Sequence, residues 1–188
     1  MTLSVLLNVA LVISACVSVW RHTHHASIWN LLRYFTILSN LFCALSALLM
    51  IVYYLSGGIG YIAMAIKYIA TVSVTVTMLT VVAFLGPTLG YRLMYSGPDL
   101  WLHLLCPLLA LGTYFIWDHM EMSGVFVLLG VVPVALYGAL YLNRVVFTDG
   151  EKAWEDFYGF NKGGKWWISL TLMLLATLLI SLALWALI

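Results

Sequence analysis

The chain has 188 residues, of which 64% are hydrophobic and 8% charged, and its formal net charge is +1. Soluble domains carry about 25% charged residues, so this composition argues against a soluble domain. The low net charge and the lack of a Lys/Arg cluster argue against nucleic acid as a partner. Apolar runs of roughly 20 residues, rather than alternating runs of about 10, indicate transmembrane helices instead of a β-barrel. We therefore predict an all-α polytopic membrane protein.

Six membrane spans are predicted within a single bundle that covers residues 1–188. Ser56-Gly57-Gly58 is typical of a helix end, and Gly86-Pro87 is expected to break the third span. The first span has no basic segment before it and no small-residue cleavage site after it, so we expect it to be retained. An acidic link, residues 118–121, joins the fourth and fifth spans. In chain order, the predicted spans cover residues 2–20, 29–55, 59–85, 98–117, 122–143 and 166–188.

Basic residues are distributed unevenly between the two sides of the predicted bundle. Lys67 lies towards the side of the termini, where we expect it to face the bundle, either snorkelling or paired. The other basic residues lie on the side of the first, third and fifth loops, which the positive-inside rule predicts to be cytoplasmic, with both termini on the opposite face. The expected location is the cell membrane, which is the inner membrane in a bacterium. The basic loop residues are Arg21, Arg33, Arg92, Arg144, Lys152, Lys162 and Lys165.

A polar stretch, residues 33–40 (RYFTILSN), opens the second predicted span. On a helix, Arg33, Thr36 and Asn40 lie along one stripe. At 1.5 Å per residue, Thr36 and His103 of the fourth span both lie roughly 8–10 Å below the basic surface. Polar side chains in a membrane normally face the bundle interior, so this shared depth predicts a buried polar tier. Further members of the tier are predicted to be Ser14, Ser18, Thr77, Thr80, Tyr137, Tyr141, Ser169 and Thr171.

His103 has two neighbours in sequence that favour a functional role. Asp99 precedes it by four residues, so its carboxylate could orient the imidazole. Pro107 follows and has no N–H, so the His103 carbonyl is expected to lose its helical donor at a kink. Thr36 and His103 would then form a nucleophile–base pair. Two structural alternatives stay open, namely a Thr36 hydroxyl bonded to the Leu32 carbonyl and an interhelical hydrogen bond from His103.

The segments around these residues resemble the androgen-induced family of six-span membrane hydrolases, which has bacterial relatives. Residues 34–41 (YFTILSNL) are similar to the second-span motif of the family. Residues 99–103 (DLWLH) with Pro107 are similar to its fourth-span motif, and residues 137–143 and 154–160 resemble the segment between the last two spans. The resemblance implies an atypical threonine hydrolase that acts on lipid esters, notably fatty acid esters of hydroxy fatty acids.

The resemblance places Thr36 at the nucleophile position and His103 at the histidine position of the family. Ser39 stands where animal members tend to carry a carboxylate, so no acid is transferred to that position. We expect Thr36 to attack the ester carbonyl and His103 to take its proton, with water releasing the acyl group. Arg33 could hold a fatty-acid carboxylate, or anchor the chain at the headgroups. Support, including oxyanion donors, is expected from Asp99, Asn40, Ser39, Tyr137 and Tyr141.

Two other functions stay open from the sequence. A membrane acyltransferase would pass the acyl group to a lipid alcohol or amine, with Cys106 as an alternative thiol nucleophile. A non-enzymatic lipid-binding protein would use the polar tier only for interhelical contacts. Histidines 22, 24 and 25 could bind a metal, but a solvated loop is favoured because no Asp, Glu or Cys lies nearby. We expect no metal or other cofactor; the expected partners are the bilayer and a lipid or fatty-acyl ester substrate.

Overall fold

The computed structural model describes residues 2–188, which form α-helices, π-helical turns and short 3₁₀ turns without a β-strand. Six helical segments in this part of the chain are long and apolar enough to cross a membrane, which confirms the all-α polytopic class. The elements are α1 (Thr2–Thr23), α2 (Ile28–Leu31), α3 (Phe35–Ser56), α4 (Gly60–Thr80), η1 (Val81–Leu85), α5 (Gly86–Leu89), α6 (Tyr91–Met94), α7 (Pro98–Leu100), η2 (Trp101–Leu105), α8 (Cys106–Ile116), α9 (Val125–Val145), η3 (Gly150–Lys152), η4 (Lys162–Gly164) and α10 (Trp166–Ala186).

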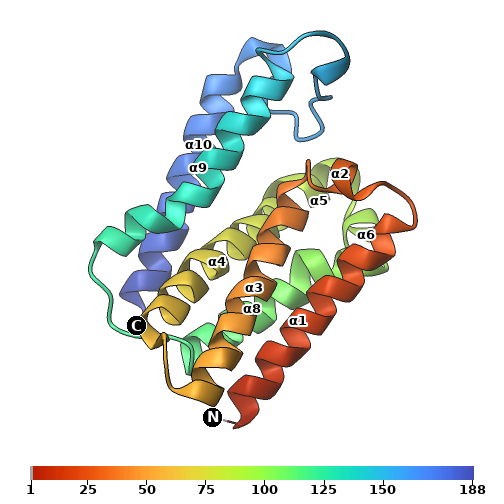
Figure 1. Cartoon of the computed structure of the whole chain (residues 1–188). Helices are drawn as coiled ribbons and strands as arrows, with labels where there is room; N and C mark the ends of the chain where they lie inside the picture. Colours follow the sequence, from red (N-terminus) through yellow and green to blue (C-terminus); the bar gives the residue numbers. More distant parts are fainter. Residues whose placement is uncertain (1) are drawn as a thin grey trace.

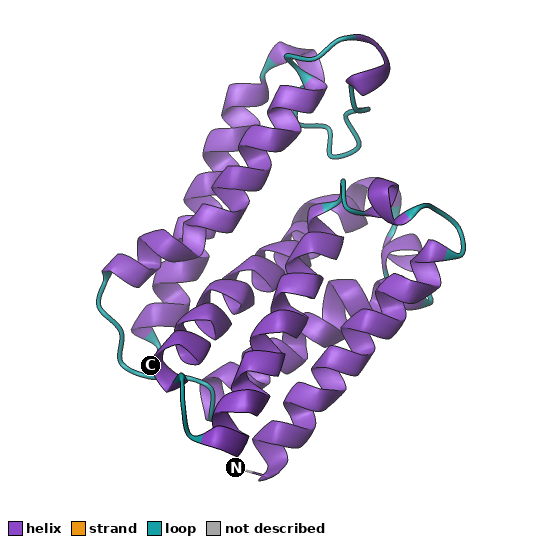
Figure 2. Ribbon diagram, in the orientation of Figure 1, coloured by secondary structure: helices purple, strands orange, loops and turns teal. Residues whose placement is uncertain are grey.

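Helix α4 is the centre of the bundle. It packs against α3, α8, α9 and α10, and its span is 61% buried, whereas that of α10 is 17% buried. Figure 1 shows α1, α3, α4 and α8 as one group, with the α9–α10 hairpin beside α4. The long loop between α9 and α10 lies at the same end of the molecule as α2 and the start of α3 (Figure 2). Elements far apart in sequence therefore meet at that end.

A small residue allows the α9–α10 hairpin to approach α4 closely. A side chain at Gly130 of α9 would collide with the Ser181 hydroxyl of α10 and approach Val72 of α4. Ser181 Oγ donates to the Val127 carbonyl at 2.9 Å, and the Tyr68 hydroxyl lies 2.7 Å from Ser181 Oγ. Small residues and interhelical hydroxyl bonds are the usual means of helix association in lipid, where apolar burial gives little driving force.

The second span begins later than predicted, which corrects the interpretation of Arg33. Ser27 caps the short helix α2, the chain then turns, and extended Tyr34 precedes the first residue of α3, Phe35. Arg33 therefore lies outside the helix that carries Thr36, and the predicted stripe through Arg33 is wrong. A turn at residues 32–34 interrupts what apolar periodicity alone joins into one helix.

The third span also differs from its prediction, because the helix continues to Leu89 past Gly86-Pro87. The π-helical turn η1 shifts the hydrogen-bond register, so that the Gly86 N–H donates to the Val81 carbonyl. In this register the carbonyl of Val82 would need the N–H that Pro87 lacks. The Tyr91 hydroxyl donates to the Val82 carbonyl instead, at 2.7 Å.

A buried ion pair lies at the end of the bundle near the termini. Lys67 Nζ is 3.3 Å from Asp118 Oδ2, and neither side chain is exposed. Lys67 also donates to Asn8 Oδ1 at 2.8 Å, while Asn8 Nδ2 donates to Asp118 Oδ2 at 2.8 Å. Ser4 Oγ and the Tyr54 hydroxyl donate to Asp118 Oδ1 at 2.8 Å and 2.9 Å. Lys67 is thus paired. Asp118 lies in the link between α8 and α9, as predicted, and its side chain joins α1, α3 and α4. We call these five residues the Lys67 cluster.

We predict that Asp118→Ala lowers the free energy of unfolding in detergent micelles by about 3–5 kcal/mol, because it leaves the buried Lys67 ammonium without its counter-charge. The exposed carboxylate of Glu121 offers a matched control, and Glu121→Ala should change stability by less than about 0.5 kcal/mol. Adding Lys67→Met to Asp118→Ala should restore part of the loss. Equal stabilities of the two single variants would contradict a structural role for the ion pair.

Candidate active site

A cavity of about 350 Å³ lies where α1, α3, η2 and the α9–α10 loop meet. It contains both predicted catalytic residues, Thr36 and His103, together with several polar groups from other elements. We call it the polar cavity. Its lining consists of His22, Ala26, Leu31, Tyr34, Thr36, Ile37, Leu85, Leu89, Met94, Asp99, Leu102, His103, Phe157 and Tyr158.

His103 is held in one tautomer by the backbone. The residue is 7% exposed, and its Nδ1 lies 2.8 Å from the carbonyl oxygen of Met94. A carbonyl can only accept a hydrogen bond, so Nδ1 carries the proton. In the neutral ring, Nε2 then has a free lone pair and the side chain lines the polar cavity. His103 is therefore prepared to accept a proton there.

The π-helical turn η2 corrects the predicted effect of Pro107. The Cys106 N–H donates to the Trp101 carbonyl, one residue further back than in an α-helix. In this register Pro107 deprives the carbonyl of Leu102, rather than that of His103, of its donor. Asn40 Nδ2 of α3 donates to the Leu102 carbonyl at 3.0 Å. Asn40 thus joins the helix of Thr36 to the turn of His103 and is a positioning residue, not an oxyanion donor as predicted.

The Thr36 hydroxyl forms no hydrogen bond with residues 2–188. The alternative bond to the Leu32 carbonyl is absent because α3 begins only at Phe35, so Leu32 is not in the preceding helical turn. The backbone of Thr36 is fixed instead, since its carbonyl accepts from Asn40 Nδ2 at 2.8 Å and from Ser39 Oγ at 3.2 Å. A fixed backbone with a free hydroxyl in a cavity suits a nucleophile.

Tyr158 is a site residue that sequence analysis did not single out. Its hydroxyl accepts from the Phe35 N–H at 3.0 Å, at the start of α3. Burial raises the pKa of Tyr158 to about 12, and nearby groups, including the Phe35 N–H and the Thr36 side chain, oppose this shift only in part. The phenol is therefore neutral at physiological pH and keeps its proton. The Thr36 side chain thus lies close enough to the Tyr158 hydroxyl to affect this pKa.

Tyr137 and Tyr141 fix the segments around the polar cavity without lining it. Tyr141 donates to Asp156 Oδ1 at 2.9 Å and accepts from the Tyr158 N–H at 3.0 Å, which fixes the loop that carries Tyr158. The Tyr137 hydroxyl donates to the Arg33 carbonyl at 2.6 Å. Both hydroxyl protons are therefore used, and the predicted role of these residues as oxyanion donors is wrong.

Arg33 is exposed and lies outside the polar cavity. Its guanidinium carbon lies 5.8 Å from the ring centroid of Trp154 in the α9–α10 loop, a cation–π distance. This geometry favours the alternative of an anchor at the membrane surface over a carboxylate-binding residue in the cavity.

Asp99 pairs with a different histidine from the one predicted. Its Oδ1 lies 3.2 Å from His22 Nε2, without the alignment of a hydrogen bond, and the two side chains are 33% and 22% exposed. The carboxylate therefore does not orient His103, whose Nδ1 is taken by the Met94 carbonyl. His22 and Asp99 both line the polar cavity; His22, which was predicted to lie in a solvated loop, is in the last turn of α1 and contributes to the site. Residues 2–188 contain no group of three or more His, Cys, Asp or Glu side chains able to hold a metal ion.

Ser39 and the remaining members of the predicted tier do not enter the polar cavity. Ser39 Oγ lies 2.9 Å from Thr77 Oγ1 of α4, so it is an interhelical contact. Ser18 is buried in α1, whereas Thr171 is exposed because α10 lies at the edge of the bundle. The shared depth of the tier therefore predicts correctly that Thr36 and His103 line one space, but it does not predict which side of each helix the other hydroxyls face.

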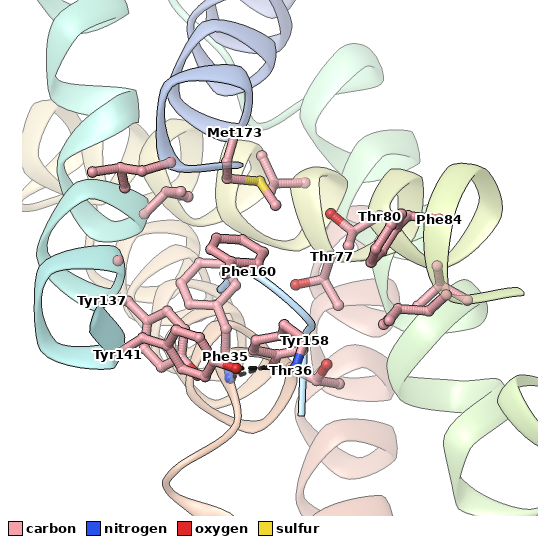
Figure 3. A pocket seen from close by; sticks show the side chains of 16 residues that line it. Phe35, Thr36, Thr77, Thr80, Phe84, Tyr137, Tyr141, Tyr158, Phe160 and Met173 are labelled. Atoms are coloured by element: carbon pink, nitrogen blue, oxygen red, sulfur yellow. Dashed lines mark hydrogen bonds between the residues drawn. The ribbon is translucent and has the colours of Figure 1, made fainter. Parts of the chain in front are cut away.

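An apolar chamber lies on the other side of Thr36, between α3, α4, α9 and α10. Figure 3 shows it with Phe35, Tyr141 and Tyr158 near Thr36, and Met173 towards α10. Its free volume is about 50 Å³. We call it the apolar chamber, and its lining consists of Phe35, Thr36, Val76, Thr77, Thr80, Val81, Phe84, Leu85, Val134, Tyr137, Gly138, Tyr141, Tyr158, Phe160, Leu170 and Met173.

No protein-family model, curated protein or solved structure matches this chain. A functional assignment therefore depends on the geometry of the polar cavity and the apolar chamber.

We predict that Asn40→Asp lowers the free energy of unfolding by about 1–3 kcal/mol. The isosteric carboxylate cannot donate to the carbonyls of Thr36 and Leu102, which then face acceptor oxygens in a buried position. The same substitution at exposed Asn30 is the control and should cost less than about 0.5 kcal/mol. Chemical unfolding of both variants in micelles measures the difference. If Asn40→Asp is as stable as the control, the hydrogen bonds from Asn40 to the two carbonyls do not stabilise the protein as proposed.

Proposed function

We propose that this chain is an intramembrane ester hydrolase that acts on fatty-acyl esters, with Thr36 as nucleophile and His103 as general base. One observation carries the proposal. Thr36 and His103, whose Nδ1 is bonded to the Met94 carbonyl so that Nε2 is left to accept a proton, line the same cavity in a bundle of six helices apolar enough to cross a membrane. A hydroxyl needs a base in its site to become an effective nucleophile. The resemblance of residues 34–41 and 99–103 to the androgen-induced hydrolases agrees with this assignment.

The acylation step follows from the groups in the polar cavity. Thr36 Oγ attacks the ester carbonyl carbon as His103 Nε2 takes the hydroxyl proton, which gives a tetrahedral intermediate. The Met94 carbonyl, bonded to Nδ1–H, holds the ring and supports the imidazolium that forms. Collapse of the intermediate breaks the bond to the alcohol oxygen, and His103 returns the proton to the leaving alcohol. The acyl group then remains on Thr36.

The negative charge of the intermediate requires hydrogen-bond donors at the start of α3. The first turn of a helix has backbone N–H groups without helical acceptors and a partial positive charge. Thr36 is the second residue of α3, and no side chain caps this helix. The neutral Tyr158 hydroxyl, which accepts from Phe35 N–H, has a proton left for the oxyanion. Tyr158 replaces Asn40, Tyr137 and Tyr141 as the side-chain donor in this mechanism.

Water completes the reaction from the side of the polar cavity. His22 and Asp99 are partly exposed at this side, whereas the apolar chamber contains no charged side chain. Once the alcohol has left, water can occupy its place beside His103. His103 takes a proton from this water as it attacks the acyl carbonyl, and then returns the proton to Thr36 Oγ as the free acid leaves.

Cys106 is not favoured as the nucleophile. It is fully buried between Ala15 of α1 and Ala44 of α3 and does not line the polar cavity. A buried cysteine in apolar surroundings is normally inert packing.

We also propose that the loops at the end of the polar cavity are cytoplasmic and both termini lie on the opposite face. Seven basic residues lie in these loops or in the helix turns beside them, and the one exception, Lys67, is paired with Asp118 in the Lys67 cluster. Single cysteines placed at Lys152 and Glu121, in a chain whose three native cysteines are replaced, test this orientation. A membrane-impermeant maleimide applied to intact cells should label position 121 and spare position 152; the reverse pattern would invert the orientation.

We predict that Thr36→Ala lowers ester turnover on the order of 10³-fold or more, because the nucleophile is lost. His103→Ala should lower it by about 10²–10⁴-fold through loss of the base. Thr36→Ser keeps a hydroxyl and should retain turnover and labelling by a fluorophosphonate probe, whereas Thr36→Ala should show neither. The purified variants are compared with a hydroxy-fatty-acid ester as substrate, and free acid is quantified.

Thr113→Ala is the matched control for Thr36→Ala, because Thr113 is a buried threonine whose hydroxyl donates to the Ala110 carbonyl and which lines neither the polar cavity nor the apolar chamber. It should keep turnover within a few-fold of the wild type. Labelling or hydrolysis that survives Thr36→Ala would exclude the proposed nucleophile. Transfer of the acyl chain to an added lipid alcohol, without free acid, would indicate an acyltransferase, and no turnover in any variant would indicate a binding protein.

A further inference from the structure

The polar cavity and the apolar chamber meet at Thr36. Three residues, Thr36, Leu85 and Tyr158, line both spaces. Thr36 therefore stands at a partition, with His103 and the His22–Asp99 pair on one side and an apolar lining on the other. An ester whose carbonyl lies at Thr36 must extend its two halves into these two environments.

A third space continues from the apolar chamber towards the outside of the bundle. It is a groove of about 520 Å³ between α4, η1 and α10, closed at one end by residues of the α9–α10 loop. Its outer wall includes Leu172 and Leu179, which are exposed on α10 and face the bilayer in a membrane-spanning bundle. The chamber and the groove share five lining residues, namely Val76, Thr80, Phe84, Phe160 and Met173. We call this space the α4–α10 groove.

We propose that the apolar chamber and the α4–α10 groove form the binding site for the acyl chain of the substrate, which reaches Thr36 sideways from the bilayer between α4 and α10. This inference rests on the proposed function, because it takes Thr36 as the residue that attacks the ester. The alcohol half of the ester then occupies the polar cavity. The substrate class is a long-chain acyl ester with a polar or amphipathic alcohol.

The chemistry of the lining favours an acyl chain over a charged occupant. None of the residues that line the chamber and the groove is charged or a histidine. The Thr77, Tyr137 and Tyr141 hydroxyls in the chamber already have hydrogen-bond partners. A charged group would lose its hydration here without gaining a counter-charge, whereas a hydrocarbon chain would pass from lipid into a mostly apolar space.

Met173 of α10 is the residue expected to set the accepted chain length. The chamber has a free volume of only about 50 Å³, so a long chain must continue into the groove past Phe84, Phe160 and Met173. Methionine is flexible and unbranched, so its side chain can move aside for a chain. A rigid, bulky side chain at position 173 would close the passage while leaving Thr36 and His103 in place.

The first experiment measures chain-length preference with methylumbelliferyl butyrate and palmitate. Met173→Trp should lower palmitate turnover relative to butyrate turnover by roughly tenfold or more, because only the long chain needs the passage. Leu182→Trp is the matched control, since Leu182 is exposed on α10 away from the groove, and it should keep the wild-type ratio. An unchanged ratio in Met173→Trp, or an equal change in the control, would overturn the assignment.

The second experiment separates this inference from the proposed function. A palmitate ester with a diazirine at the chain end is photo-crosslinked to Thr36→Ala in bilayers, and the labelled peptides are mapped. Labelling within residues 76–84 or 169–180, lost in Met173→Trp, supports the chain site even if no variant hydrolyses an ester. Labelling elsewhere overturns the chain site, and Thr36-dependent hydrolysis would then leave the proposed function intact.

Discussion

The hydrogen bonding of the backbone around two prolines is the constraint on which the site depends. Inside a bilayer no water satisfies a carbonyl that a proline has deprived of its donor. Both prolines that follow a π-helical turn, Pro87 and Pro107, meet this requirement with a side chain from elsewhere. The Tyr91 hydroxyl bonds to the carbonyl of Val82 and the Asn40 amide bonds to that of Leu102. The second bond crosses between helices, so satisfying one carbonyl also fixes η2 against α3. His103 and Thr36 lie on the two sides of that bond.

The two ends of the bundle treat buried polar groups in opposite ways. In the Lys67 cluster the ammonium and the carboxylate are each paired and hydrogen-bonded, so the cost of burying two charges is offset. In the polar cavity the Thr36 hydroxyl has no partner, and His103 bonds through Nδ1 only. Thr36 is half-buried and lines the cavity, so water or a ligand can supply a hydrogen-bond partner there. Such access distinguishes a site from a structural contact. This difference indicates a functional role for the end of the bundle that contains the polar cavity, and a structural role for the end near the termini.

The sequence was informative about features that depend on one helix, and less so about features that depend on two. Composition and run length predict the six spans, and counting residues along each helix brings Thr36 and His103 to one level. Asp99 illustrates the limit, because spacing on its own helix predicts a contact with His103, while the nearer partner in space is His22 of α1. Asp118 lies in the link where it was predicted, but its contact with Lys67 was not predicted, for the same reason, since Lys67 lies on another helix.

Local register was the other source of error. A π-helical turn adds one residue to the hydrogen-bonded ring, so the carbonyl affected by Pro107 is that of Leu102 and the need for Asn40 cannot be read from α-helical spacing. The position of Tyr158 depends on a loop without periodicity. That loop is fixed by Asp156, which accepts from the Tyr141 hydroxyl and from two backbone N–H groups. An Asp–Tyr contact between a loop and a helix leaves no pattern in a single sequence.

The partition at Thr36 and Tyr158 also explains how the proposed chemistry would favour hydrolysis in the presence of lipid. During acylation the alcohol half fills the polar cavity and excludes water from His103. When the alcohol leaves, the acyl chain still fills the apolar chamber, so lipid cannot reach the acyl-threonine from the α4–α10 groove. The vacated polar cavity then offers the remaining approach, and its partly exposed lining, including His22 and Asp99, admits water. The order of the two steps thus follows from which half of the ester departs first, without a moving lid.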